Sequence, residues 1–89
     1  MANITIIELT TPGCHICAEA KQFFEVEFKA QFPGVEVRYV SVLEEEGQAL
    51  VSEHSIFASP AIFINGELIS TGGFNKKNII EKVNILLLK

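Results

Sequence analysis

Two runs that favour extended structure, residues 3–9 and 35–42, lie on either side of a stretch with helical periodicity, residues 14–31. The first run is rich in β-branched residues, which favour strands. Phenylalanines at a spacing of four mark one face of the helical stretch: Phe24, Phe28 and Phe32. A strand, a helix and a second strand in this order favour parallel pairing through a right-handed crossover. The pattern therefore predicts an α/β fold whose first two strands are parallel.

A second helix and a hairpin are indicated further along the chain. Ser41 is followed three residues later by Glu44, which has the form of a capping box at the start of a short helix. Beyond it, an apolar strand at 61–64 is followed by Asn65-Gly66, a type I′ turn signal that returns the chain as residues 67–70. The hairpin adds two antiparallel strands to the sheet.

The last segment predicts a helix with an apolar face. Asn75 can cap its start, and Phe74 is placed to pack against Ile79 as a hydrophobic staple. The apolar stripe, which we expect in the core, consists of Ile79, Ile80, Val83, Leu86 and Leu87. The element order is β-α-β-α-β-β-α, which predicts a mixed four-stranded sheet flanked by helices.

Length and composition limit the classes of function. The 89 residues are 48% hydrophobic, which is enough for one core, so we expect a single domain over residues 1–89. A net charge of −4 with seven basic residues offers no cluster to hold phosphate backbones, so we expect no nucleic-acid partner. The apolar runs are shorter than the roughly 20 residues that span a bilayer, so we expect no membrane association. No secretory leader precedes the first strand, so we expect a cytoplasmic protein, and a monomer.

Cys14 and Cys17 carry the strongest chemical signal in the chain. Three residues apart at the start of a helix, they share a face and fall within the Cα separation of about 4.4–6.8 Å that a disulfide tolerates. The unpaired N–H groups that begin a helix stabilise an anion, so we expect the pKa of the Cys14 thiol to lie below the free-cysteine value of about 8.5. Cys14 can then attack a disulfide, and Cys17 can resolve the mixed disulfide that forms.

Several motifs together with the cysteine pair resemble a known family. They are Glu8-Leu9, the run from Thr11 through Pro12, Gly13, Cys14, His15 and Ile16 to Cys17, then Ala58-Ser59-Pro60, Asn65-Gly66 and Gly72-Gly73. On these segments, over essentially its whole length, the chain resembles the thioredoxin superfamily, on its small thioredoxin-like and glutaredoxin-like side. The resemblance implies the thioredoxin fold. It also implies a thiol–disulfide oxidoreductase, acting as a protein disulfide reductase or electron carrier, with Cys14 as nucleophile and Cys17 as resolving thiol.

The resemblance further implies a substrate-binding surface around the cysteines. In the family, the proline that matches Pro60 has a cis peptide bond and lies beside the cysteines. The residue before it, here Ser59, offers backbone hydrogen bonds to an extended substrate. The residues implied for this surface are Pro12, Gly13, Ile16, Ser59, Pro60, Gly72 and Gly73. The implied partners are disulfide-containing proteins and a reductase or low-molecular-weight thiol, with the Cys14–Cys17 disulfide as the redox group and no separate cofactor or metal.

Two segments differ from the patterns within the family. The pair His15-Ile16 is neither the glycine–proline of thioredoxins nor the proline–tyrosine of glutaredoxins, which leaves the redox potential open. A protonated His15 could stabilise the Cys14 thiolate, or it could be a solvated residue with little effect. Thr11 and residues 74–77 replace the residues with which glutaredoxins hold glutathione, so glutathione is a disfavoured partner.

Glu8 lies six residues before Cys14, where thioredoxins carry a buried aspartate that exchanges protons with the second cysteine. It shares a strand face with Ile4 and Ile6, so we expect desolvation to raise its pKa. The resemblance implies a catalytic carboxyl that acts on Cys17. The alternative is an ordinary carboxylate paired with a nearby lysine.

Other interpretations remain open at this point. The cysteines could hold zinc or an iron–sulfur cluster, but two cysteines and two histidines would need a dimer to close a four-ligand zinc site. The chain could also be a binding module whose thiols are inert. Phe57 could form an apolar rim with Ile16 that docks the substrate, or it could belong to the core.

Overall fold

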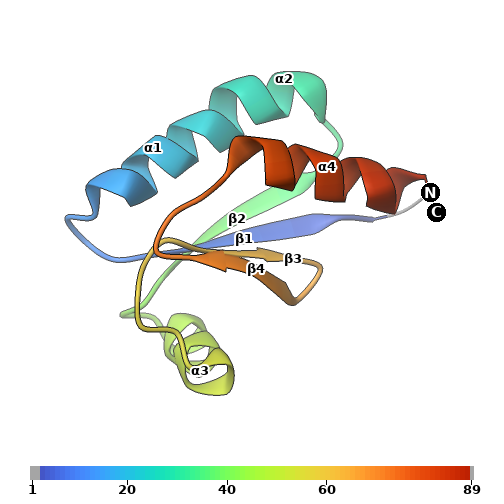
Figure 1. The fold of residues 1–89 in the computed structure, drawn as a ribbon. Coiled ribbons are helices and arrows are strands. Elements are labelled where there is room, and N and C mark those ends of the chain that lie inside the picture. Colours follow the sequence, from blue (N-terminus) through green and yellow to red (C-terminus); the bar gives the residue numbers. More distant parts are fainter. Residues whose placement is uncertain (1–2, 89) are drawn as a thin grey trace.

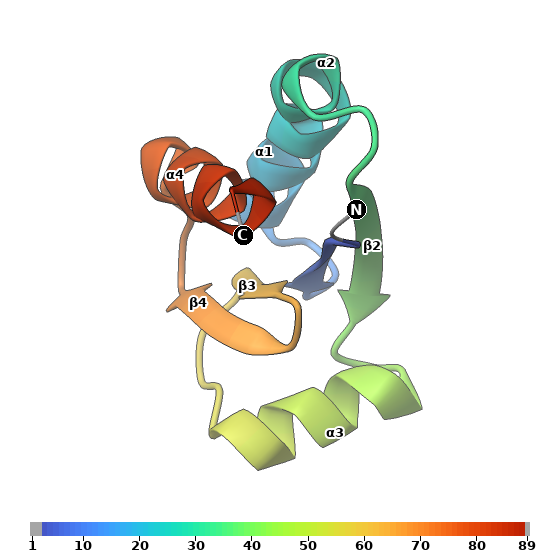
Figure 2. The same cartoon turned by 90° about the vertical axis from the view of Figure 1, so that its right-hand side faces the viewer.

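The computed structural model describes residues 3–88 and has a four-stranded sheet with helices on both faces (Figures 1 and 2). The elements follow one another as β1 (Thr5–Thr10), α1 (His15–Phe23), the π-helix η1 (Phe24–Phe28), α2 (Lys29–Gln31), β2 (Glu36–Ser41), α3 (Glu45–His54), β3 (Ala61–Ile64), β4 (Glu67–Thr71) and α4 (Lys76–Leu87). The strand order is β2-β1-β3-β4, with β1 parallel to β2 and the other pairs antiparallel. The predicted mixed sheet is confirmed.

The register of the central strand β1 determines which side chains share a face. Glu8 lies opposite Tyr39 of β2 and opposite Ile62 of β3. Paired positions point to the same side of a sheet, so these three side chains face the layer formed by α1 and α4. Leu9 points the other way, toward α3.

Two apolar clusters lie on the two sides of the sheet. The larger one lies under α1, η1 and α4 and contains Ile4, Ile6, Ala20, Phe23, Phe24, Phe28, Phe32, Ile62, Ile64, Ile79 and Val83. The smaller one lies under α3 and contains Leu9, Val40, Ile56, Ala61 and Phe63. Burial on both faces explains why β3 is apolar at all four positions, each of which is buried.

The long helix after β1 contains a widened turn that the sequence did not predict. Residues 24–28 form a π-helix, in which each N–H bonds to the carbonyl five residues earlier. A spacing of four exceeds the 3.6 residues per turn of an α-helix, so Phe24 and Phe28 would drift around a regular helix. The wider turn keeps them on one face, where their ring centroids are 5.5 Å apart and Phe32 follows at 4.9 Å from Phe28.

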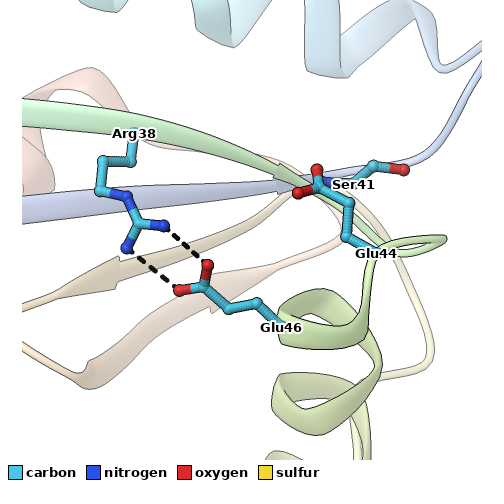
Figure 3. A network of polar contacts seen from close by, with 4 residues as sticks. All are labelled: Arg38, Ser41, Glu44 and Glu46. Atoms are coloured by element: carbon cyan, nitrogen blue, oxygen red, sulfur yellow. Dashed lines mark hydrogen bonds and ion pairs between the residues drawn. The ribbon is translucent and has the colours of Figure 1, made fainter.

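The start of α3 differs from the predicted capping box (Figure 3). The N-cap is Glu44, whose carboxylate accepts a hydrogen bond from the N–H of Ser41 at 2.8 Å. The Ser41 hydroxyl, however, accepts from the N–H of Leu43 at 3.1 Å and caps no helical residue, because the helix begins at Glu45. Half of the predicted reciprocal pair is therefore present.

Two further contacts hold α3 against β2. The guanidinium of Arg38 donates to both carboxylate oxygens of Glu46, at 3.0 and 2.6 Å (Figure 3). A Cβ on Gly47 would overlap the carbonyl oxygen of Ser41, so only glycine allows this approach of the helix to the strand.

The predicted hairpin and last helix are present, with one correction. Asn65 and Gly66 have φ values of 50° and 84°, as a type I′ turn requires. Asn75 caps α4 by accepting a hydrogen bond from the N–H of Asn78 at 3.0 Å. Leu87 was predicted to be in the core, but it is 46% exposed because the end of α4 extends past the buried positions Ile79 and Val83. Over the described residues, none of the helices has the length and apolar character needed to cross a membrane.

Candidate functional site

The cysteine pair lies at the end of α1 that follows the β1–α1 turn. Gly13 has a φ of +80°, a backbone conformation that residues other than glycine rarely adopt. The N–H of Cys14 donates to the carbonyl of Thr11 at 3.1 Å. This turn places Cys14 at the N-cap of α1, with extended backbone angles. Its Sγ accepts a hydrogen bond from the N–H of Cys17 at 3.1 Å. A sulfur thus occupies the capping position that an oxygen usually holds.

The two sulfurs form a disulfide but differ in access to solvent. The Cα atoms of Cys14 and Cys17 are 5.2 Å apart, within the normal range for a disulfide. Cys17 is only 5% exposed, whereas Cys14 is partly exposed. A partner molecule can therefore reach the sulfur of Cys14 first.

The loop before β3 lies beside the disulfide. The expected cis peptide bond between Ser59 and Pro60 is present. The hydroxyl of Ser59 lies within hydrogen-bonding distance of Cys14 Sγ, at 3.8 Å. Ser59 is partly exposed and Pro60 is buried, so the serine is the accessible member of this pair next to the reactive sulfur.

The double glycine is attached to the same loop. The N–H of Gly72 donates to the carbonyl of Pro60 at 3.0 Å, and the carbonyl of Gly73 accepts from the hydroxyl of Ser70 at 3.1 Å. Gly72 has a φ of +76°, and a Cβ there would lie 3.2 Å from the Cβ of Ala58. A side chain at this position would strain the backbone and crowd the loop that carries Ser59.

Apolar side chains are exposed near the disulfide. Phe57, two residues before Ser59, is 95% exposed, and Ile16, between the cysteines, is 43% exposed. The interpretation of Phe57 as a core residue is therefore wrong, because its neighbour Ile56 enters the small cluster under α3 while the ring of Phe57 lies outside it. Pro12, in the turn before the cysteines, is also exposed.

Glu8 is the buried charged residue of the sheet. Its side chain is fully buried, and neither carboxylate oxygen has a hydrogen-bond partner among the described residues. Burial raises the pKa of Glu8 to about 7, an effect that the positive charge of Lys21 partly opposes. The expected raised pKa is confirmed, and no ion pair joins Glu8 to a lysine in the described part of the chain, as the alternative interpretation required.

Two side chains near Glu8, those of Tyr39 and Lys21, were not predicted from the sequence to belong to the site. Tyr39 is opposite Glu8 in the sheet, and burial, followed by the charges of Glu25 and Glu8, raises the pKa of Tyr39 to about 12. Lys21 places its Nζ 5.1 Å from the centroid of the Tyr39 ring. The position of Lys21 four residues after Cys17 was a usable signal, since such residues share a helix face.

His15 points along the exposed side of α1. Its Nε2 lies 3.3 Å from a carboxylate oxygen of Glu19, one turn further on, and its side chain is 89% exposed. A contact of this kind in open solvent contributes little to stability. The geometry is compatible with both interpretations of His15, so its influence on Cys14 stays a prediction.

Comparison with known proteins assigns the family. A model of the thioredoxin domain family matches residues 2–84. This chain belongs to the thioredoxin family. A thioredoxin from Methanocaldococcus jannaschii is 32% identical over 83 residues, which cover 93% of this chain and 95% of that protein. The family and the cysteine pair together support thiol–disulfide chemistry.

Solved structures of the thioredoxin fold superimpose well on this chain. A thioredoxin-like protein from Clostridium perfringens gives a TM-score of 0.77 at 22% identity, covering 98% of this chain and 73% of that one. A domain of the alkylhydroperoxide reductase AhpF from Enterococcus faecalis gives 0.72 at 25% identity, covering 91% of this chain and 38% of that one. The thioredoxin fold predicted from the resemblance is confirmed.

Metal ligands do not gather in the described part of the chain. Residues 3–88 contain no group of three or more His, Cys, Asp or Glu side chains arranged to hold an ion. In this structure the two cysteines bond to each other, so nothing specific favours the zinc or iron–sulfur interpretation.

Proposed function

We propose that this thioredoxin-family protein reduces disulfides in other proteins through its Cys14–Cys17 pair. The observation that carries the proposal is the difference between the two sulfurs. Cys14 is accessible at a helix N-cap, where the N–H of Cys17 points at its Sγ, while Cys17 is buried one turn away. In the reduced protein the same N–H groups would stabilise a Cys14 thiolate.

The reaction is a two-step exchange. The Cys14 thiolate attacks one sulfur of the substrate disulfide, forming a mixed disulfide and releasing the other substrate sulfur as a thiolate. The Cys17 thiolate then attacks Cys14 Sγ, forming the internal disulfide and releasing the second substrate sulfur. The substrate gains two electrons and two protons, and the Cys14–Cys17 dithiol loses them. A separate reductase or low-molecular-weight thiol restores the dithiol.

Glu8 supplies proton transfer to the second step. It lies in β1 on the face covered by α1, whose buried side carries Cys17. A carboxyl with a pKa of about 7 is well matched to taking a proton near neutral pH. In this proposal Glu8 accepts the Cys17 proton as that thiol becomes the attacking thiolate.

The substrate lies along the accessible loops around Cys14. The backbone of Ser59, next to the cis bond, offers hydrogen bonds to an extended segment, and Phe57 and Ile16 offer apolar contact area. Pro12, Gly13, Gly72 and Gly73 shape the two turns that border this surface. Protein substrates suit this open, apolar surface better than a small polar ligand.

Single substitutions of the cysteines test the proposal with insulin as a disulfide substrate and dithiothreitol as reductant. Cys14→Ser should abolish catalysed reduction, and Cys17→Ser, mixed with insulin after the dithiothreitol has been removed, should accumulate a mixed disulfide visible by mass spectrometry. Ala49→Ser, on the exposed side of α3, is the matched control and should keep the full rate. Full activity in Cys14→Ser would instead make the chain a binding module with incidental thiols.

A further inference from the structure

The surroundings of Glu8 are polar on one side only. On the β3 side its neighbour is Ile62, which is fully buried. On the β2 side its neighbour is Tyr39, which is partly buried and belongs to an edge strand of the sheet. Tyr39 is therefore the neighbour of Glu8 on the side of the sheet's open edge.

The side chain of Lys21 lies over Tyr39 at this edge of the sheet. It extends from α1, four residues after Cys17, and its Nζ lies 5.1 Å from the centroid of the Tyr39 ring. A cation over an aromatic face is attracted to the ring, so the ring favours this position of the exposed lysine side chain. The ammonium group is thereby kept on the same side of the sheet as Glu8.

Among residues 3–88, the other groups that face Glu8 supply no positive charge. On α1 and β2 they are Cys17 and Tyr39, and Tyr39 is neutral at physiological pH because its pKa is about 12. Glu25 of η1 lies beside Tyr39 and is negative. The residues of β3 and α4 in this cluster are the apolar Ile62, Ile79 and Val83. In the part of the chain that the structure describes, Lys21 is the cation that acts on Glu8.

We propose that Lys21, held over the ring of Tyr39, is a positioning residue that favours the carboxylate form of Glu8 and so sets the pH at which Cys17 becomes an attacking thiolate. This inference rests on the proposed function for its catalytic part. A buried carboxyl without hydrogen-bond donors is strongly biased toward its protonated form. A protonated carboxyl cannot accept the proton of Cys17, so a nearby cation enlarges the ionised fraction of Glu8 that can act near neutral pH.

The test compares Lys21→Met, Lys21→Arg and Lys29→Met. Methionine keeps the unbranched chain and removes the charge, and arginine keeps the charge. Lys29→Met is the matched control, because Lys29 is an exposed lysine about two turns further on, in α2, which continues the same helix through η1. The first measurement is the titration of the Glu8 carboxyl carbon by NMR in the oxidised protein, in which the cysteines do not titrate.

The second measurement isolates the resolving step. A mixed disulfide between Cys14 and a coloured aromatic thiol is formed in acid, and release of that thiol by Cys17 is followed after jumps to higher pH. Glu8→Gln is included to show whether the profile depends on this carboxyl.

In Lys21→Met, we expect the Glu8 titration and the pH profile of release both to move upward by roughly 0.5 to 1 on the pH scale. Lys21→Arg and Lys29→Met should match the wild type. An unchanged Glu8 titration in Lys21→Met, or an equal displacement in Lys29→Met, overturns the assignment to Lys21. If the titration moves but Glu8→Gln leaves the release profile unaltered, the base role of Glu8 in the proposed function fails, and the catalytic part of this inference fails with it.

Discussion

Replacing Glu8 by glutamine should change the stability of the oxidised protein in a way that depends on pH. The pKa of Glu8 is about 7 in the folded protein, against 4.5 for an ordinary glutamate, a difference of about 2.5. Each pKa unit corresponds to about 1.4 kcal/mol, so a buried Glu8 carboxylate lowers the free energy of unfolding by at most about 3.5 kcal/mol.

The direction of the stability change follows from the pH at which the folded and the unfolded states each release the Glu8 proton. Below about pH 4.5 both states are protonated, and Glu8 has no charge-dependent effect on stability. As the pH rises toward 7, Glu8 ionises in the unfolded chain but stays largely protonated in the folded protein, so the wild type loses stability. Above about pH 7 the loss is complete. Glutamine stays neutral throughout, so its own packing cost is the same at every pH.

Urea unfolding of wild type and Glu8→Gln at about pH 4.5 and about pH 8.5 measures this difference. The free energy of unfolding of the variant, measured relative to that of the wild type, should be greater at the higher pH by up to about 3.5 kcal/mol. Glu53→Gln, an exposed carboxylate in α3, should show almost no such change. A stability difference between Glu8→Gln and wild type that is equal at both pH values would refute the conclusion that Glu8 is ionised at a cost inside the fold.

Three other substitutions test separate parts of the structure. Gly47→Ala should destabilise the protein by about 1–3 kcal/mol in urea unfolding, because the new Cβ overlaps the Ser41 carbonyl; an unchanged midpoint would show that α3 can move away freely. Asn75→Ala should cost about 1 kcal/mol in the same assay through loss of the α4 cap, with Asn75→Ser restoring most of it. Phe57→Ser should leave stability within about 0.5 kcal/mol, since the ring is exposed. It should nevertheless lower kcat/KM several-fold for a protein disulfide and leave kcat/KM for a small aromatic disulfide unchanged. A variant that matches the wild type with both substrates would argue against docking on this ring.

Local patterns in the sequence were sufficient for the order of elements and for the cysteine site. The β-branched runs, the Asn65-Gly66 turn and the Asn75 cap are each determined by neighbouring residues, so they could be recognised one at a time. The position of Glu8 on the buried face also followed from its alternation with Ile4 and Ile6.

Features that depend on contacts between distant segments were missed. The π turn at 24–28 satisfies the packing of several phenylalanines against the sheet at once, and their spacing of four is also typical of a regular α-helix. The contact of Lys21 with Tyr39 joins α1 to β2 and needs the register of the sheet. Whether Phe57 is buried depended on the path of the loop before the cis bond, which residue type alone does not determine.

The two residues between the cysteines, His15 and Ile16, point outward and are largely free of the core. Substitutions at exposed positions usually change stability by no more than about 0.5 kcal/mol. The integrity of the fold therefore does not depend on which side chains stand between the cysteines. On the prediction that His15 acts on Cys14, exchanging these two side chains would alter the electron affinity of the disulfide without any need to repack the interior beneath them.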